Sequence, residues 1–270
     1  MLLSFYNTFY KQKSYSMKKY ISLIVLALLL APSIMYAQGG LLSFSELTNA
    51  FTFHLFDAMV KPEEVNVLDL CNTEVTEMPE GTFFNNLQAL YISNAPLTVT
   101  KWVDQSSPEL LNPANILILD ISNNDLESLP KGIITMTSLV SLNIGGNPEL
   151  IKFVDQSSPD IASVEILNIS NNNLSTIPGF INKLALLKEI NLSGNSIVSK
   201  EVDKCTPKLA AIEKIDLSNN EITALVDWLL EQKAFESYPN LVKLNLKGNP
   251  LNEGEIEQIR ELLPKTKVIY

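Results

Sequence analysis

One spacing of apolar residues recurs along most of the chain from position 65 onward. Each copy has an apolar residue, two further residues, an apolar residue, one residue, an apolar residue, two residues, an asparagine, one residue and a last apolar residue. The copies begin at positions 65, 87, 116, 139, 164, 187, 212 and 241. Six copies carry the asparagine, whereas the first has Thr73 and the second has Ala95 there. A period of this length predicts a chain built by stacking one structural unit on the next.

The apolar residues within a copy alternate with polar ones, as Leu119 and Ile121 do in "ILILDISNNDL". This period of two predicts a short strand with one buried face. The asparagine follows the strand, where the chain turns inward, and a buried amide without partners costs about 1–3 kcal/mol. We therefore predict that the asparagines form a ladder, each bonded to the backbone of its own and the adjacent coil: Asn124, Asn147, Asn172, Asn195, Asn220 and Asn249.

The pattern resembles the leucine-rich repeat, whose fingerprint is L-x-x-L-x-L-x-x-N-x-L. Within that family it is similar to the 23-residue N-x-L-x-x-L-P type common in bacteria, as in "ESLPKGI" and "STIPGFI". The resemblance implies an α/β fold, a right-handed solenoid with a parallel β-sheet on its concave side. Short helices or 3-10 turns would then occupy the convex side, with a helical cap at the N-terminal end and a helix and strand at the C-terminal end.

The beginning of the chain has the layout of a secretory signal. Met17, Lys18 and Lys19 precede an apolar run over residues 20–31, and Ala37 offers a cleavage point. The alternative is an uncleaved anchor, but the run is shorter than the roughly 20 apolar residues that cross a bilayer. We expect residues 1–37 to be upstream residues and a signal peptide starting at Met17, as in Gram-negative envelope proteins.

The remaining chain divides into a cap, the repeats and a second cap. Apolar residues at helical spacing over 43–60 predict a capping helix within residues 38–64. Eight repeats occupy residues 65–251. Asn252 and Glu255 have the spacing of a capping box, so we expect a helix through Leu263 and a final strand in "KVIY", within a cap over 252–270.

A ten-residue phrase, "KWVDQSSPEL" from position 101, returns as "KFVDQSSPDI" from 152 and, eroded, as "KEVDKCTPKL" from 200. It marks every second coil, and its Ser-Pro or Thr-Pro step predicts a short helical turn. Since Glu201 shares the column of Trp102 and Phe153, these aromatic rings form a candidate contact patch on the convex or flanking side, about 10 Å apart. Alternatively, they lie over the convex core and Glu201 swings outward.

Charge and residue counts exclude several function classes. Losing the four lysines of residues 1–37 leaves 16 basic residues against 30 acids, a net charge of −14, with Arg260 the only arginine. Nucleic-acid binding is therefore not expected. The only histidine, His54, has no cysteine near it in the sequence, so histidine-dependent triads and metal clusters have nowhere to form. We expect no enzyme, catalytic residue, metal site or cofactor.

The outward-facing strand residues form the other candidate surface. In a solenoid they line the concave face, which here changes from partly apolar to charged toward the C-terminal end. Asp, Asn and Ser are also ordinary fillers at these positions, so a face without a specific epitope is the alternative. The candidate residues for binding a partner are Tyr91, Ile118, Asp120, Asn143, Ile166, Asn168, Glu189, Asn191, Lys214, Asp216, Lys243 and Asn245.

Proteins of the resembled family generally bind other proteins or glycans through the solenoid surface. The resemblance therefore implies a non-enzymatic interaction module for a protein or glycan partner. The signal places it in the periplasm, at the cell surface or outside the cell, without an integral membrane span after cleavage. The alternatives are a structural or self-associating envelope component, and an inhibitor or cofactor of an extracellular enzyme. The ligand, the binding face and the oligomeric state stay open.

The two cysteines are predicted to remain free thiols in the monomer. Cys71 lies on the first coil and Cys205 on the sixth, so five strand spacings of about 4.8 Å separate them by roughly 24 Å. A disulfide needs Cα atoms within about 7 Å. Alkylation of the unfolded, unreduced monomer should add two labels to its mass. An intramolecular bond would contradict both this prediction and the coil count.

Overall fold

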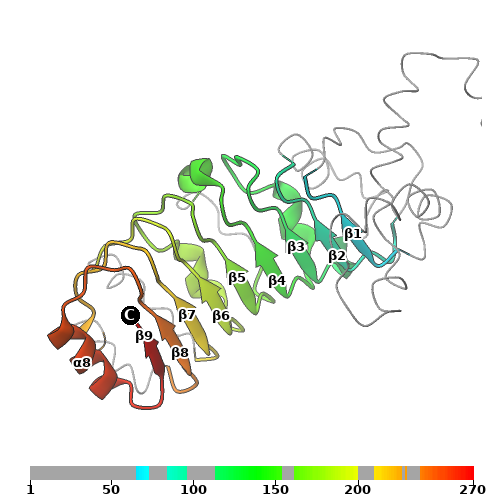
Figure 1. The fold of residues 1–270 in the computed structure, drawn as a ribbon. Coiled ribbons are helices and arrows are strands. Elements are labelled where there is room, and N and C mark those ends of the chain that lie inside the picture. Colours follow the sequence, from blue (N-terminus) through cyan, green and yellow to red (C-terminus); the bar gives the residue numbers. More distant parts are fainter. Residues whose placement is uncertain are drawn as a thin grey trace, which may run out of the picture.

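The computed structural model describes residues 65–72, 84–95, 113–153, 161–199, 210–226, 229 and 238–270. Its strands form one open parallel sheet in which each strand pairs with the next along the chain (Figure 1). The strands are β1 (Val67–Asp69), β2 (Ala89–Tyr91), β3 (Ile118–Asp120), β4 (Ser141–Asn143), β5 (Ile166–Asn168), β6 (Glu189–Asn191), β7 (Lys214–Asp216), β8 (Lys243–Asn245) and β9 (Lys267–Ile269). The predicted right-handed leucine-rich-repeat solenoid is confirmed.

Each strand occurs where the repeat pattern places it, and the pairing follows the repeat columns. Leu119 of β3 is opposite Leu142 of β4, which in turn is opposite Leu167 of β5. All three are almost completely buried, because alternate residues of a strand point to opposite faces. The final strand expected in "KVIY" is β9, which pairs with β8.

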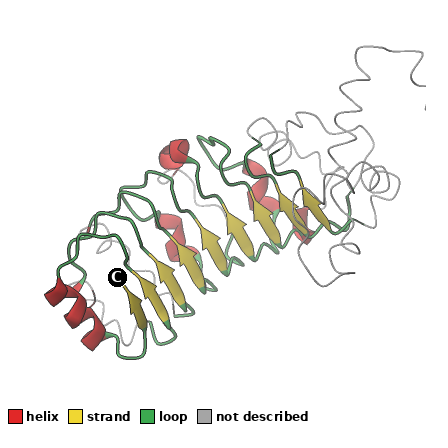
Figure 2. Cartoon of the chain, in the orientation of Figure 1, coloured by secondary structure: helices red, strands yellow, loops and turns green. Residues whose placement is uncertain are grey.

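Short helices lie in the connections between successive strands (Figure 2). They are the 3-10 helices η3 (Pro113–Asn115), η4 (Lys131–Thr135), η5 (Pro148–Phe153) and η6 (Gly179–Lys183). Pro130 and Pro178, the prolines of the two N-x-L-x-x-L-P motifs, cap η4 and η6 with φ near the value that the proline ring imposes. The Ser-Pro and Thr-Pro steps, where we predicted helical turns, lie outside the described residues, as does the predicted N-terminal capping helix.

The C-terminal helix α8 (Glu253–Leu262) closes the other end of the solenoid (Figure 1). Asn252 caps it as predicted, because its side chain accepts a hydrogen bond from the Glu255 amide at 2.9 Å. The second half of the capping box differs from the expectation: the Glu255 carboxylate accepts hydrogen bonds from the amides of Leu225 and Val226. This contact ties the cap to the preceding coil, so Glu255 stabilises tertiary structure as well as belonging to the first turn of α8.

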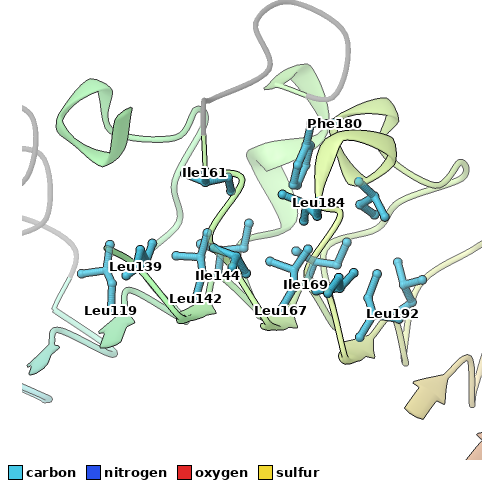
Figure 3. Packing of buried hydrophobic residues seen from close by; sticks show 14 of the residues in the cluster. Leu119, Leu139, Leu142, Ile144, Ile161, Leu167, Ile169, Phe180, Leu184 and Leu192 are labelled. Atoms are coloured by element: carbon cyan, nitrogen blue, oxygen red, sulfur yellow. The ribbon is translucent and has the colours of Figure 1, made fainter. Parts of the chain in front are cut away.

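One continuous apolar core runs through the coils. Leu119, Leu142 and Leu167 line its strand side, and Phe180 and Leu184 lie across from them (Figure 3). Leu244 of β8 belongs to the same cluster. Each coil contributes only a thin apolar layer, so a coil is stable only when its neighbours cover it.

The six asparagines of the repeat connect consecutive coils. Asn172 is typical: its Nδ2 donates to the carbonyl oxygens of Ile144 and Ile169, at 3.1 and 3.2 Å, and its Oδ1 accepts from the Asn147 amide at 2.6 Å. The corresponding bonds to the preceding coil and to their own coil are made by Asn124, Asn147, Asn195, Asn220 and Asn249. Ala95 is buried at the same position and has no side-chain polar atom, so the ladder reaches the second coil through Asn124.

A second column lies one residue before the ladder and has a left-handed backbone. Its members have φ between 53° and 77°. From position 123 onward asparagine and glycine alternate, and the asparagine of one coil folds over the glycine of the next. A Cβ atom on Gly146 would lie 2.0 Å from Oδ1 of Asn123. The column consists of Asn72, Asn94, Asn123, Gly146, Asn171, Gly194, Asn219 and Gly248.

Replacing Gly146 with alanine should therefore destabilise the protein. The left-handed backbone conformation costs about 1–2 kcal/mol for a residue with a Cβ, and the clash with Asn123 adds to it. We expect the urea midpoint to fall for Gly146→Ala and to recover partly when Asn123→Gly is added. Gly179→Ala is the control, because a Cβ there meets nothing within 4 Å; equal midpoints for the two single variants would contradict the packing argument.

Candidate functional site

The parallel register assembles the predicted concave residues into two columns. The column formed by the first residue of each strand runs through Ile118, Ser141, Ile166, Glu189, Lys214 and Lys243. The column formed by the third residue runs through Tyr91, Asp120, Asn143, Asn168, Asn191, Asp216 and Asn245. All twelve predicted contact residues thus lie on one face of the sheet, although this placement does not test whether they bind anything.

The third-residue column is largely occupied by internal hydrogen bonds. Asp120 Oδ1 accepts from the Ser122 amide at 2.9 Å, and Asn143 Nδ2 donates to Asp120 Oδ2 at 2.8 Å. Asp216 and Asn245 repeat this pairing at 2.9 Å. Side-chain oxygens that accept an amide two residues later make the turn that ends the strand. The Asp and Asn residues therefore have a structural role that the sequence analysis did not identify.

The next outward column offers little surface at three of its serines. Ser122, Ser170 and Ser218 are buried. The hydroxyl of Ser122 donates to Asp120 Oδ1, and that of Ser218 donates to Asp216 Oδ1, both at 2.6 Å. These serines support the turns, so the more exposed side chains lie mainly in the first-residue column and at the position before it.

Four aliphatic residues lie at the first residue of β3, β4 or β5 or one residue before it, and we refer to them as the apolar patch: Leu117, Ile118, Val140 and Ile166. Ile166 is 43% exposed and Leu117 is 37% exposed. The backbone hydrogen bonds from Val140 to Leu117 and from Ile166 to Val140 show that the residues belong to adjoining coils. Ser141 lies between Ile118 and Ile166 in the register. The strand pattern in the sequence indicates only the two isoleucines, because it assigns no role to the position before the strand.

Charged residues follow the apolar patch toward the C-terminal end. Lys188 pairs with Glu165 at 2.7 Å, and Lys214 pairs with Glu189 at 2.5 Å. The hydrogen bond and the charge of the glutamate raise the pKa of each lysine. These pairs join consecutive coils on the exposed face. Column comparison could have found them, since both partners of each pair occupy the same repeat position.

The N-terminal end of the face carries a protonated thiol beside a tyrosine. Burial, followed by a hydrogen bond with Asp69, raises the pKa of Cys71 to about 12. Burial, followed by the charges of Asp120 and Asp69, raises the pKa of Tyr91. A nucleophilic cysteine needs the opposite environment, one that stabilises the thiolate. Cys71 is a free cysteine.

The other predicted site residues lie wholly or partly outside the described structure. Trp102, His54 and Cys205 are not among the described residues, and Phe153 ends η5 without a described side chain. The convex aromatic patch therefore stays a prediction. Among the described residues, no group of three or more His, Cys, Asp or Glu side chains is arranged to hold a metal ion. None of the helices in these residues has the length and apolar character of a membrane span.

Comparison with known proteins agrees with the architecture. The Leucine Rich Repeat family model matches residues 163–184. The chain is similar to a Leptospira interrogans LRR protein (TM-score 0.56, 24% identity, 80% of this chain and 56% of that one). It is also similar to internalin C2 of Listeria monocytogenes (TM-score 0.54, 18% identity, 93% of this chain and 94% of that one). A third similar structure is human 5T4 (TM-score 0.58, 19% identity, 77% of this chain and 78% of that one). No curated protein matches the sequence.

The repeat pattern, the sheet register and these similarities together show a leucine-rich-repeat fold, and residues 163–184 match the family model itself. The chain spans a little over half the length of the Leptospira protein. At these identities the solved structures establish the fold only. Stacked repeats of this kind are protein-interaction scaffolds in general, because they present an extended curved surface.

Alkylation kinetics should reveal the unusual environment of Cys71. At pH 8 its thiol is protonated, so iodoacetamide should label it about 100-fold or more slowly in the folded chain than in urea. The labelling rate should rise steadily with pH above 8, because the pKa lies near 12. Asp69→Asn should accelerate labelling, since Asp69 raises the pKa. Peptide-resolved mass spectrometry provides the rates; equal rates in folded and unfolded chains would contradict this description.

Proposed function

We propose that this protein is an exported interaction module that binds a partner protein through the apolar patch of its concave face. The observation that supports this most strongly is the exposure of Ile166 and Leu117 on a sheet whose neighbouring columns are committed to internal hydrogen bonds. Exposed aliphatic side chains that gather on adjoining coils favour a binding surface, whereas singly scattered ones do not. A curved repeat sheet also places several coils within reach of one partner.

A protein partner fits the patch better than a glycan. Sugar rings stack on flat aromatic side chains, but Tyr91 is the only aromatic residue in the strands described here, and it is half-buried. Branched aliphatic side chains pack instead against apolar side chains of a polypeptide. The sequence of the first 37 residues supports export to the periplasm, the cell surface or the medium, and Trp102 and Phe153 remain a second candidate surface.

The proposal extends to the organisation of the chain. Residues 1–37 would be removed on export, 38–64 would cap the first coil, 65–251 would hold the repeats and 252–270 would close the last coil. No part of this scheme needs a catalytic residue or a cofactor. The protein would act by holding its partner.

An affinity isolation followed by variant binding tests the proposal. Proteins retained by the immobilised chain would be identified by mass spectrometry, purified and measured directly against wild type and two variants. Ile166→Glu should weaken binding about tenfold or more, since it places a charge in the contact. Leu186→Glu is the matched control, because Leu186 is 51% exposed but lies outside the strands.

Both variants should melt as the wild type does, because both side chains are already solvent-exposed. A purified partner that binds Ile166→Glu as tightly as the wild type would contradict the concave assignment. Failure to recover any protein that binds directly would contradict the interaction function itself.

A further inference from the structure

Three lysines gather at the C-terminal end of the concave face. Lys243 begins β8 and Lys267 begins β9, and the two are opposite each other in the register. Lys247 follows on the outward side beyond β8, and all three side chains are exposed. We refer to Lys243, Lys247 and Lys267 as the lysine patch.

The lysine patch places like charges side by side. Lys214 of β7, Lys243 and Lys267 occupy the same position on three successive strands, which lie about 4.8 Å apart. Like charges directly opposite each other on a sheet are destabilising. The sequence therefore keeps an arrangement that opposes folding in a chain with a formal net charge of −10.

Within this row, an ion pair with a glutamate offsets the charge of the first lysine only. Lys214 is paired with Glu189, whereas no described residue forms an ion pair with Lys243, Lys247 or Lys267. The nearby carboxylate of Asp216 already accepts hydrogen bonds from Asn245 and Ser218. The lysine patch is thus a local excess of positive charge on an acidic protein.

We propose that the lysine patch binds an acidic polypeptide segment of the partner, next to an apolar side chain held on the apolar patch. This inference rests on the proposed function and specifies the chemistry of the partner. Ile166 on β5 and Lys243 on β8 are three strand spacings apart, about 14 Å. An extended chain covers that distance in roughly four residues. The matching segment therefore has its acidic residues about four positions from its apolar residue.

The charge distribution favours a short acidic segment over a long polyanion. A nucleic acid or a sulfated glycan lying along the face would also meet Glu189 and Glu165, which pair with Lys214 and Lys188 on the preceding coils. The negative net charge of the protein would repel the part of the polyanion that extends beyond the lysine patch. A cluster of a few glutamates or aspartates fits within the two strands that carry the lysine patch. Val242, which precedes Lys243 and is 52% exposed, offers an additional apolar contact to this segment.

Fluorescence anisotropy with a designed peptide tests this proposal on the full chain. The probe is a fluorescein-labelled peptide with two leucines followed, after a three-residue spacer, by four glutamates; the comparison peptide has glutamines instead. The glutamate peptide should bind about tenfold or more tightly than the glutamine peptide. Its affinity should fall as salt is raised, because the charges are exposed.

Paired lysine variants locate the interaction. Lys243→Gln combined with Lys267→Gln should reduce binding of the glutamate peptide about tenfold. Lys183→Gln is the matched control, an exposed lysine at the end of η6, and should leave binding unchanged. The double variant should melt about 1–3 °C higher than wild type, because it relieves like-charge repulsion. Lost binding with raised stability excludes misfolding as the cause.

Several results would overturn the proposal. Equal binding of the two peptides, or of wild type and double variant, would remove the role of the lysine patch. Stronger binding of heparin or of a single-stranded oligonucleotide would assign the patch to a polyanion. Self-association that the double variant abolishes would assign it to a second copy of the chain. A purified partner sensitive to Ile166→Glu but not to the lysine variants would refute this inference and leave the proposed function intact.

Discussion

The structure depends on one interaction, the bonding of a buried asparagine amide to two consecutive coils. Each coil turns sharply after a strand of only three residues, which leaves carbonyl and amide groups inside the core. Asn172, fully buried, satisfies three of them, on Ile144, Ile169 and Asn147. A buried polar group without a partner would be costly, so the amide and the turn require each other. The same bonds set the register of the coils and hence the columns of the exposed face.

That constraint also limits where a binding site can lie. The strand-ending turns use the side chains of Asp120, Asn143 and their equivalents, and buried serines such as Ser122 support them. The residues available to a partner are those whose side chains form no hydrogen bond in a turn. They are the apolar patch around Ile166, the lysine-glutamate pairs on the following coils and the lysine patch at the C-terminal end. An apolar centre next to a charged margin is an arrangement common at protein interfaces. The sheet of the solenoid thus contains columns whose side chains maintain the fold and one column whose side chains are available to contact a partner.

Sequence reasoning reached far into the fold because repeat columns behave as an internal alignment. It located every described strand, the asparagine ladder and the start of α8 at Asn252. It assigned Asn252 and Glu255 to a capping box, whereas the Glu255 carboxylate binds the amides of Leu225 and Val226. It also overlooked Leu117 and Val140, since a strand template assigns no role to the residue before the strand. The Glu255 contact was missed because a period describes one coil, whereas this contact forms between coils.

The sequence alone determined the solenoid, because spacing of apolar residues and asparagines dictates which side chains are buried. It likewise determined the net acidity and the single histidine. Only the tertiary structure decided which polar residues are consumed by turns, that Asn123 covers Gly146, and that Cys71 is held as a protonated thiol. It also decided that Lys243 and Lys267 lie side by side. Such properties depend on distances between residues of neighbouring coils, and those distances exist only once the coils have stacked.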